Sequence, residues 1–124
     1  MLACRRYRCT ACGAIITVVP RGVAPRRHYG YGAIAMALAL WALGREPAAA
    51  VRRRVCAWPI AGPSATGWPA LRRWARAARA VSTAALTLGA VAARAAQIAV
   101  GRAPPTLRSA PICAQAFAGG SAMP

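Results

Sequence analysis

The sequence has almost no acidic side chains: Glu46 is its single carboxylate, and aspartate is absent from all 124 residues. Lysine is absent as well, so all 17 basic residues are arginine, and there is one histidine. Glycosidases and aspartic proteases need a pair of carboxylates, a Ser-His-Asp triad needs an acid to orient its histidine, and Mg²⁺ or Ca²⁺ cages need several carboxylates. We therefore expect no enzyme within this chain and infer no small-molecule substrate for it.

Because acids are missing, the formal net charge is +16. Such an excess of arginine makes most of the surface positive and favours DNA or another polyanion as partner, with an anionic membrane surface less favoured. The chain is nevertheless 58% hydrophobic, which is not typical of a disordered tail. Much of this content is alanine, which buries little area per residue, so we expect one small domain with loose ends.

The sequence also lacks a long hydrophobic run. Residues 33–43 form the longest one, whereas a bilayer-spanning helix needs roughly 20 apolar residues. Residues 10–20 are too short and too polar for the hydrophobic region of a signal peptide. The five cysteines are an odd number, which argues against a closed set of disulfides. We therefore expect a cytoplasmic protein.

The order of the periodic segments predicts a mainly α fold. It consists of a small helical, helix-turn-helix-like unit, preceded by a short β/zinc-knuckle remnant and followed by a disordered C-terminal tail. The β-prone run covers residues 15–19 and ends at Pro20. The expected organisation is a partial zinc-ribbon-like basic segment (1–28), the helix-turn-helix-like unit (29–81), an Ala-rich helix (82–100) and the disordered tail (101–124).

Two helices are expected in the first part of the helical unit. One covers residues 31–43, is apolar on more than one face and stops at Gly44. The next opens at Glu46 and Pro47, where proline suits the first turn and the carboxylate complements the helix dipole. Its narrow apolar stripe is formed by Val51, Val55 and Trp58. We expect the tryptophans to be core anchors rather than stacking platforms for bases.

A third helix follows Thr66 as N-cap, with Pro69 in its first turn. One side of this helix gathers the apolar residues Leu71, Trp74, Ala75 and Ala78. The other side gathers the arginines Arg72, Arg73, Arg76 and Arg79. An amphipathic helix that comes after a helix and a Gly/Pro turn is typical of a helix-turn-helix, whose second helix faces DNA.

This arginine face has a functional and a purely structural interpretation. Arginine forks match phosphate oxygens and the guanine edge, whereas in an ordinary protein such a face is simply solvated. Because no acid neutralises it here, we favour nucleic acid as its partner. Further contacts to the DNA backbone are expected from Arg52, Arg53, Arg54, Arg26 and Arg27.

Cys9 and Cys12 form a C-x-x-C-G turn with Gly13 ahead of the β-prone run. In zinc ribbons such a turn presents two thiolates to one metal ion, but structural zinc needs four ligands. Three alternatives stay open: incidental reduced cysteines, half of a zinc ribbon whose first pair lies before the chain start, or a site completed by Cys4 and His28. Zinc is therefore the only cofactor considered, with half a site present.

The segment RYRCTACG, residues 6–13, resembles the second knuckle of the zinc ribbon that opens many bacterial transposases and a related bacterial domain of uncharacterised function. In those proteins the knuckle precedes a short strand, a basic connector and a helix-turn-helix. Residues 66–74, TGWPALRRW, are similar to the start of the family's last, DNA-facing helix. The resemblance covers roughly residues 4–80. It implies a truncated protein, without the first cysteine pair and without the acidic catalytic core.

We therefore predict a DNA-binding fragment of a transposase-like or helix-turn-helix protein that contacts phosphates through arginines and lacks a catalytic core. The first alternative is a decayed or mispredicted reading frame with no selected function, since a single acid in 124 residues is unusual for a selected gene product. The second alternative is a cationic amphipathic binder of membrane surfaces that uses residues 68–79 and 82–100.

Overall fold

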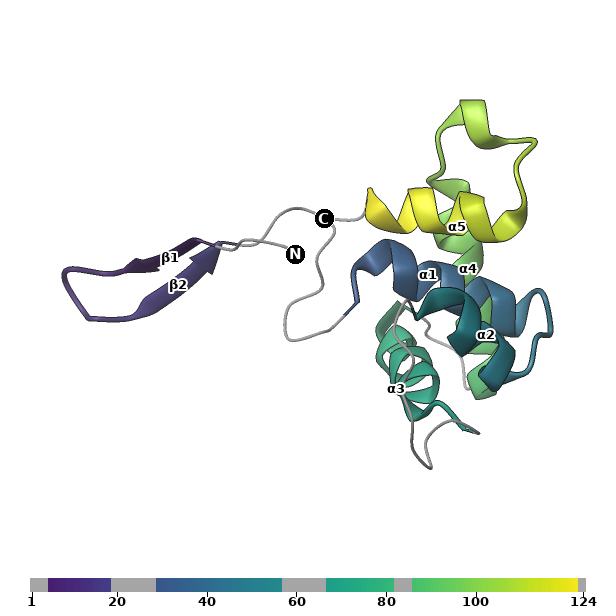
Figure 1. Cartoon of the computed structure of the whole chain (residues 1–124), viewed down its shortest axis with the longest axis horizontal. Helices are drawn as coiled ribbons and strands as arrows, with labels where there is room; N and C mark the ends of the chain where they lie inside the picture. The colour runs from purple at the N-terminus through teal and green to yellow at the C-terminus, as the bar shows by residue number, and fades with distance from the viewer. Residues whose placement is uncertain (1–4, 19–28, 57–66, 82–85, 123–124) are drawn as a thin grey trace.

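The computed structural model describes residues 5–18, 29–56, 67–81 and 86–122, and this part of the chain is mainly helical, as the sequence predicts (Figure 1). Its elements are β1 (Arg5–Arg8), β2 (Ile15–Val18), α1 (Tyr31–Ala42), α2 (Ala48–Val55), α3 (Pro69–Ala77), the 3₁₀-helix η2 (Ala78–Val81), α4 (Leu88–Gly101), the 3₁₀-helix η3 (Pro105–Leu107) and α5 (Ile112–Ser121).

β1 and β2 form an antiparallel hairpin, and the sequence analysis missed its first strand. The backbone N–H of Cys9 donates to the carbonyl of Ala14 at 2.8 Å, and that of Gly13 donates to the carbonyl of Cys9 at 3.0 Å. Gly13 has φ 72°, a left-handed conformation that glycine adopts at little cost. Figure 1 draws the hairpin clear of the helices, and all its strand residues are exposed.

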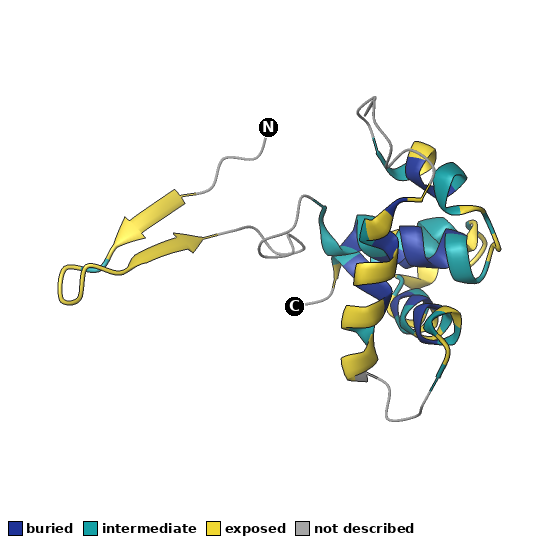
Figure 2. Cartoon of the chain, turned by 90° about the horizontal axis from the view of Figure 1, so that it is seen from below, coloured by how far each residue is buried: buried dark blue, intermediate teal, exposed yellow. Residues whose placement is uncertain are grey.

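The helical body is built around α1, which packs against α5, α4, α2 and α3 (Figures 1 and 2). A helix that is apolar on several faces needs neighbours on several sides, and α1 has them, as the sequence predicts. Its buried residues are Gly32, Ala35, Ala37, Leu38, Ala39 and Leu40. The helix ends just before Gly44, whose N–H donates to the carbonyl of Ala39 at 2.9 Å.

Two glycines of α5 let its backbone come very close to α4 and α1. A Cβ atom at Gly119 would lie 2.7 Å from the carbonyl carbon of Ala99 in α4. A Cβ atom at Gly120 would lie 2.9 Å from the carbonyl oxygen of Tyr31 in α1. Real Cβ atoms do not approach backbone atoms this closely, so α5 can pack here only without side chains at these positions.

The prediction of a disordered tail over residues 101–124 is wrong for residues 101–122. This segment contains η3 and α5, and α5 packs on α1 and α4. Prolines and glycines indicated disorder because they are frequent in loops. Here Pro111 instead occupies the N-cap of α5, and Gly119 and Gly120 are buried contact points between helices.

The Ala-rich helix starts later than the sequence predicts. α4 begins at Leu88. Leu86 and Thr87 are therefore not helical, contrary to the prediction of a helix from residue 82, and residues 82–85 lie outside the described part. Thr87 is the N-cap: its Oγ1 accepts a hydrogen bond from the N–H of Ala90 at 3.3 Å. Among the described residues, no helix has both the length and the apolarity that crossing a membrane requires.

α2 and α3 cover the remaining sides of α1. In α2, Val51 is fully buried and Val55 is partly buried, which confirms two positions of the expected apolar stripe. Trp58, the third position, lies outside the described residues. The prediction of Thr66 as N-cap is wrong, because the N-cap of α3 is Trp68. α3 packs against α1 and α4. The turn that would join α2 and α3 as a helix-turn-helix falls in residues 57–66, also outside the described part, so that arrangement stays a prediction.

Candidate nucleic-acid interface

The candidate interface is one face of α3. The helix begins at Pro69, where the missing N–H costs little because the first turn has no intrahelical acceptor for it. Its apolar side is fixed in the core by Leu71, Trp74 and Ala75, which are at most 5% exposed. The opposite side carries Arg72, Arg73 and Arg76, and Arg79 follows in the 3₁₀-helix η2, which continues directly from α3. All four predicted arginines are exposed. The division into a buried and a charged face is therefore as the sequence predicts.

An aromatic cluster holds α3 in place. The rings of Trp68 and Trp74 meet edge to face with centroids 5.1 Å apart. Tyr29, just ahead of α1, contacts both rings in the same manner, at 6.0 Å from Trp68 and 5.2 Å from Trp74. Edge-to-face aromatic pairs stabilise a fold by more than the burial of their surface area alone. Both tryptophans are core anchors, as predicted, and they fix the direction in which the arginine face points.

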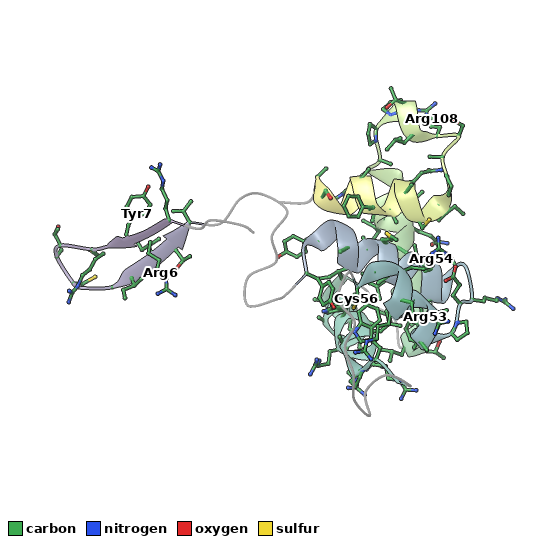
Figure 3. All side chains as sticks on the ribbon, viewed as in Figure 1. Arg6, Tyr7, Arg53, Arg54, Cys56 and Arg108 are labelled. Atoms are coloured by element: carbon green, nitrogen blue, oxygen red, sulfur yellow. The ribbon has the colours of Figure 1, made fainter. Side chains whose placement is uncertain are left out.

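The three arginines of α2 have three different surroundings. Arg53 is exposed and stays available as a candidate contact. Arg52 is only 8% exposed, which disfavours the predicted contact with the DNA backbone. It is one of two buried residues of α2, together with Val51. Arg54, labelled in Figure 3, forms an ion pair with Glu46 and is thereby partly neutralised.

Glu46 does not open α2, so that prediction is wrong: the helix begins at Ala48, with Pro47 as its N-cap. Glu46 lies ahead of α2, outside its first turn, and accepts a hydrogen bond from the guanidinium of Arg54 near the end of that helix. The same guanidinium lies 3.9 Å from Sγ of Cys113 in α5. No sequence signal could have found this cluster, because Cys113 falls in the segment expected to be disordered.

Beneath this surface, Tyr29 and Cys56 form a polar contact at the edge of the core. The hydroxyl of Tyr29 lies 2.7 Å from Sγ of Cys56, and either group can donate (Figure 3). Burial, together with the Cys56 thiol, raises the pKa of Tyr29 from 10.0 to about 12, while the charge of Arg52 acts in the opposite direction. Tyr29 therefore remains a neutral phenol at physiological pH, as the apolar surroundings of the tryptophans require.

The cysteine knuckle lies at the tip of the hairpin, away from this interface. Backbone N–H groups of Cys12 and Ala11 and the thiol of Cys12 donate to Sγ of Cys9 and lower the pKa of its thiol. Both thiols are free, and Cys12 is exposed. Within the described residues no three His, Cys, Asp or Glu side chains gather as metal ligands. A single copy of the described chain therefore offers zinc half a ligand set.

The remaining predicted site residues lie outside the described part of the chain. They are Cys4, Arg26, Arg27 and His28. A zinc site completed by Cys4 and His28 and backbone contacts from the two arginines therefore stay predictions.

Comparison with protein families, with curated proteins and with solved structures found no match for this chain. The site therefore has to be judged on its own geometry and charge.

Proposed function

We propose that this protein is a DNA-binding module that contacts phosphates through the exposed face of α3, without a catalytic core. The observation that carries the proposal is the exposure of Arg72, Arg73 and Arg76 on the side of α3 that faces away from the core, with the exposed Arg79 following in η2. Arginine presents a planar fork that matches two phosphate oxygens, and the charge does not depend on pH. The helix also keeps the three guanidinium groups of α3 on one surface.

The electrostatics of the body support a polyanion as partner. Glu46 is the only carboxylate side chain of the sequence, and it is paired with Arg54 in α2. No acidic side chain is therefore left to neutralise the α3 face, whose four arginines repel one another in the absence of a counter-charge. An anionic lattice such as a phosphate backbone removes that repulsion, and the released counterions favour binding at low salt.

The same packing disfavours the membrane alternative. A helix that lies on a bilayer must offer its apolar side to lipid. In α3 that side consists of Leu71 and Trp74, with Trp68 at its start, and all three are buried among other helices. Insertion would require the body to open. The resemblance of residues 6–13 and 66–74 to transposase N-terminal regions also favours DNA.

The experiment compares two variants that lose the same charge. The first changes Arg72, Arg73, Arg76 and Arg79 to glutamine. The second, a control, changes four exposed arginines elsewhere: Arg45, Arg94, Arg102 and Arg108. Binding to a random-sequence DNA duplex is measured by fluorescence anisotropy over a range of salt concentrations.

We expect the α3 variant to lose affinity much more than the control. Its log–log slope against salt should decrease by about 0.9 for each phosphate contact removed. Far-UV circular dichroism of both variants should match the wild type, because the changed side chains are exposed. Equal losses in the two variants would show that net charge alone attracts DNA, and the proposal would fail. Absence of DNA binding by the wild type at low salt would also overturn it.

A further inference from the structure

The hairpin tip carries two thiols whose surroundings are already arranged for a metal ion. Cys9 and Cys12 flank a tight turn in which the N–H of Gly13 donates to the carbonyl of Cys9. The turn holds Cys9 and Cys12 together at the hairpin tip, where both thiols are free and Cys12 is exposed. Neighbouring backbone N–H groups lower the pKa of Cys9 and so favour the thiolate that a metal ion binds.

One face of the same hairpin is exposed and mostly apolar, with Arg5 as its one charged strand residue. Strand pairing sets Tyr7 opposite Ile16 and Arg5 opposite Val18, so these four residues share a face. Tyr7, Ile16 and Val18 are 51%, 57% and 53% exposed. The other face holds Arg6, Arg8, Ile15 and Thr17. A two-stranded hairpin of this length is not stable in water without a layer against its apolar side.

The metal ligands and the apolar face are continuous with one another. The N–H of Cys9 donates to the carbonyl of Ala14, so the ladder extends one residue beyond β1. Side chains alternate along a strand, which places Cys9 on the side of Tyr7 and Ile16. A group that binds zinc together with Cys9 and Cys12 therefore also comes to lie at the end of this apolar face.

We propose that two copies of this chain share one zinc ion, with each copy supplying Cys9 and Cys12. Structural zinc takes four ligands in a tetrahedron, and four thiolates are a common set. Each copy supplies half, and a second copy brings an identical apolar face to cover the first, as expected for a two-fold interface. Binding releases the four thiol protons, since thiolates are the ligands.

The charges of the hairpin fit a tetrathiolate centre. Four thiolates outweigh the charge of Zn²⁺, so the centre is negative. Arg5, Arg6 and Arg8 lie in the strand that leads to the knuckle, and residues 5–18 contain no acidic side chain. The arginines therefore stabilise the centre, and its negative charge reduces their repulsion across the interface. This inference does not depend on DNA binding, so each proposal can fail alone.

The test adds Zn²⁺ to the reduced full-length chain and measures mass by native mass spectrometry and analytical ultracentrifugation. We expect one zinc per two chains and a doubled mass, both reversed by a chelator. Replacing zinc by Co²⁺ should give the absorption spectrum of a tetrahedral tetrathiolate. The double variant Cys9→Ser/Cys12→Ser should lose metal and dimer together, while Cys56→Ser/Cys113→Ser should retain both. Unchanged circular dichroism in the first variant would exclude unfolding of the helices.

Two outcomes would assign the metal differently. One zinc per chain on a monomer would overturn the proposal, as would loss of zinc in Cys4→Ser or His28→Ala, because either result indicates a site within one chain. Absence of zinc binding by the reduced wild type would also overturn it.

The apolar face has its own test. The variant Tyr7→Ser/Ile16→Ser should weaken the zinc-bound dimer several-fold, whereas Ile15→Ser, on the arginine face, should leave it nearly unchanged. Equal effects would overturn the placement of the second copy on the Tyr7 face.

Discussion

Large apolar side chains are exposed in the hairpin, whereas even small ones are buried in the helical body. Ile15 and Ile16 are 67% and 57% exposed in the hairpin, although both are larger and more hydrophobic than the alanines that fill the body. Ala37, Ala75 and Ala92 are completely buried in α1, α3 and α4. Hydrophobicity alone therefore does not decide burial in this protein. Burial depends on whether a second layer of structure packs against the side chain. Within the described part of one copy, only the helices have such a layer.

Small residues are what make the helical layers possible here. An alanine buries little area, so many helices must meet closely before their contacts sum to a stable core. Glycines at the crossings of α5 allow that approach, and the Trp68–Trp74–Tyr29 cluster supplies the large buried area that alanines do not. Substitutions in the helical body should therefore cost far more stability than substitutions in the hairpin.

Trp74→Ala should have the largest effect on stability. The side chain is 5% exposed and contacts the rings of Trp68 and Tyr29. Removal of a buried aromatic ring typically costs about 3–5 kcal/mol, which is comparable with the whole stability of many small domains. Urea unfolding followed by circular dichroism measures it. A loss below about 1 kcal/mol would show that the aromatic cluster is not part of the cooperative core.

Gly119→Ala should destabilise the body by about 1–3 kcal/mol, because the new methyl group collides with the backbone of Ala99 and forces α5 away from α4. Gly89→Ala in α4 is the matched control. No atom from another part of the protein lies within 4 Å of a Cβ at that position, and alanine is the better helix former. The control should gain about 0.5–1 kcal/mol. If both variants gained stability, the close crossing of α5 would be disproved.

High pH should weaken the body through Tyr29. Its pKa is raised to about 12 in the folded protein, so the folded state holds the phenol proton more tightly than the unfolded state, whose pKa is near 10.0. This contribution is fully present below pH 10 and is lost as the pH rises toward 12. Unfolding experiments across this range should show falling stability. Tyr29→Phe should remove part of the slope, and the difference in tyrosinate absorbance between the two proteins should titrate near pH 12.

Val18→Ala in the hairpin should have the smallest effect, within about 0.5 kcal/mol in zinc-free solution, because the side chain is 53% exposed. The same change at Val91 in α4 is its counterpart. Val91 is 1% exposed, and loss of its two methyl groups should cost roughly 2 kcal/mol. Similar effects at the two positions would show that the hairpin has a covering layer in one copy of the chain.

The sequence predicted the fold where its signals were local. The period of apolar residues located α1, and the alternation of Leu71 and Trp74 with arginines located α3 and its exposed face. It failed where the signal depended on contacts distant in the chain. Arg52 was expected to be exposed like the other arginines of α2, yet it is buried, because burial depends on what packs beside the helix. Gly119 and Gly120 indicate a loop by composition, but they serve as contact surfaces.

Residue types and their spacing were enough to predict the charge, the scarcity of carboxylates and the amphipathic character of α3. The C-terminal helix packed on α1, the pairing of Arg54 with the single glutamate, and the absence of a layer over the hairpin within the described residues became evident only from the folded chain. Packing depends on which surfaces of distant segments come into contact, and the spacing of residues along the chain does not specify those contacts.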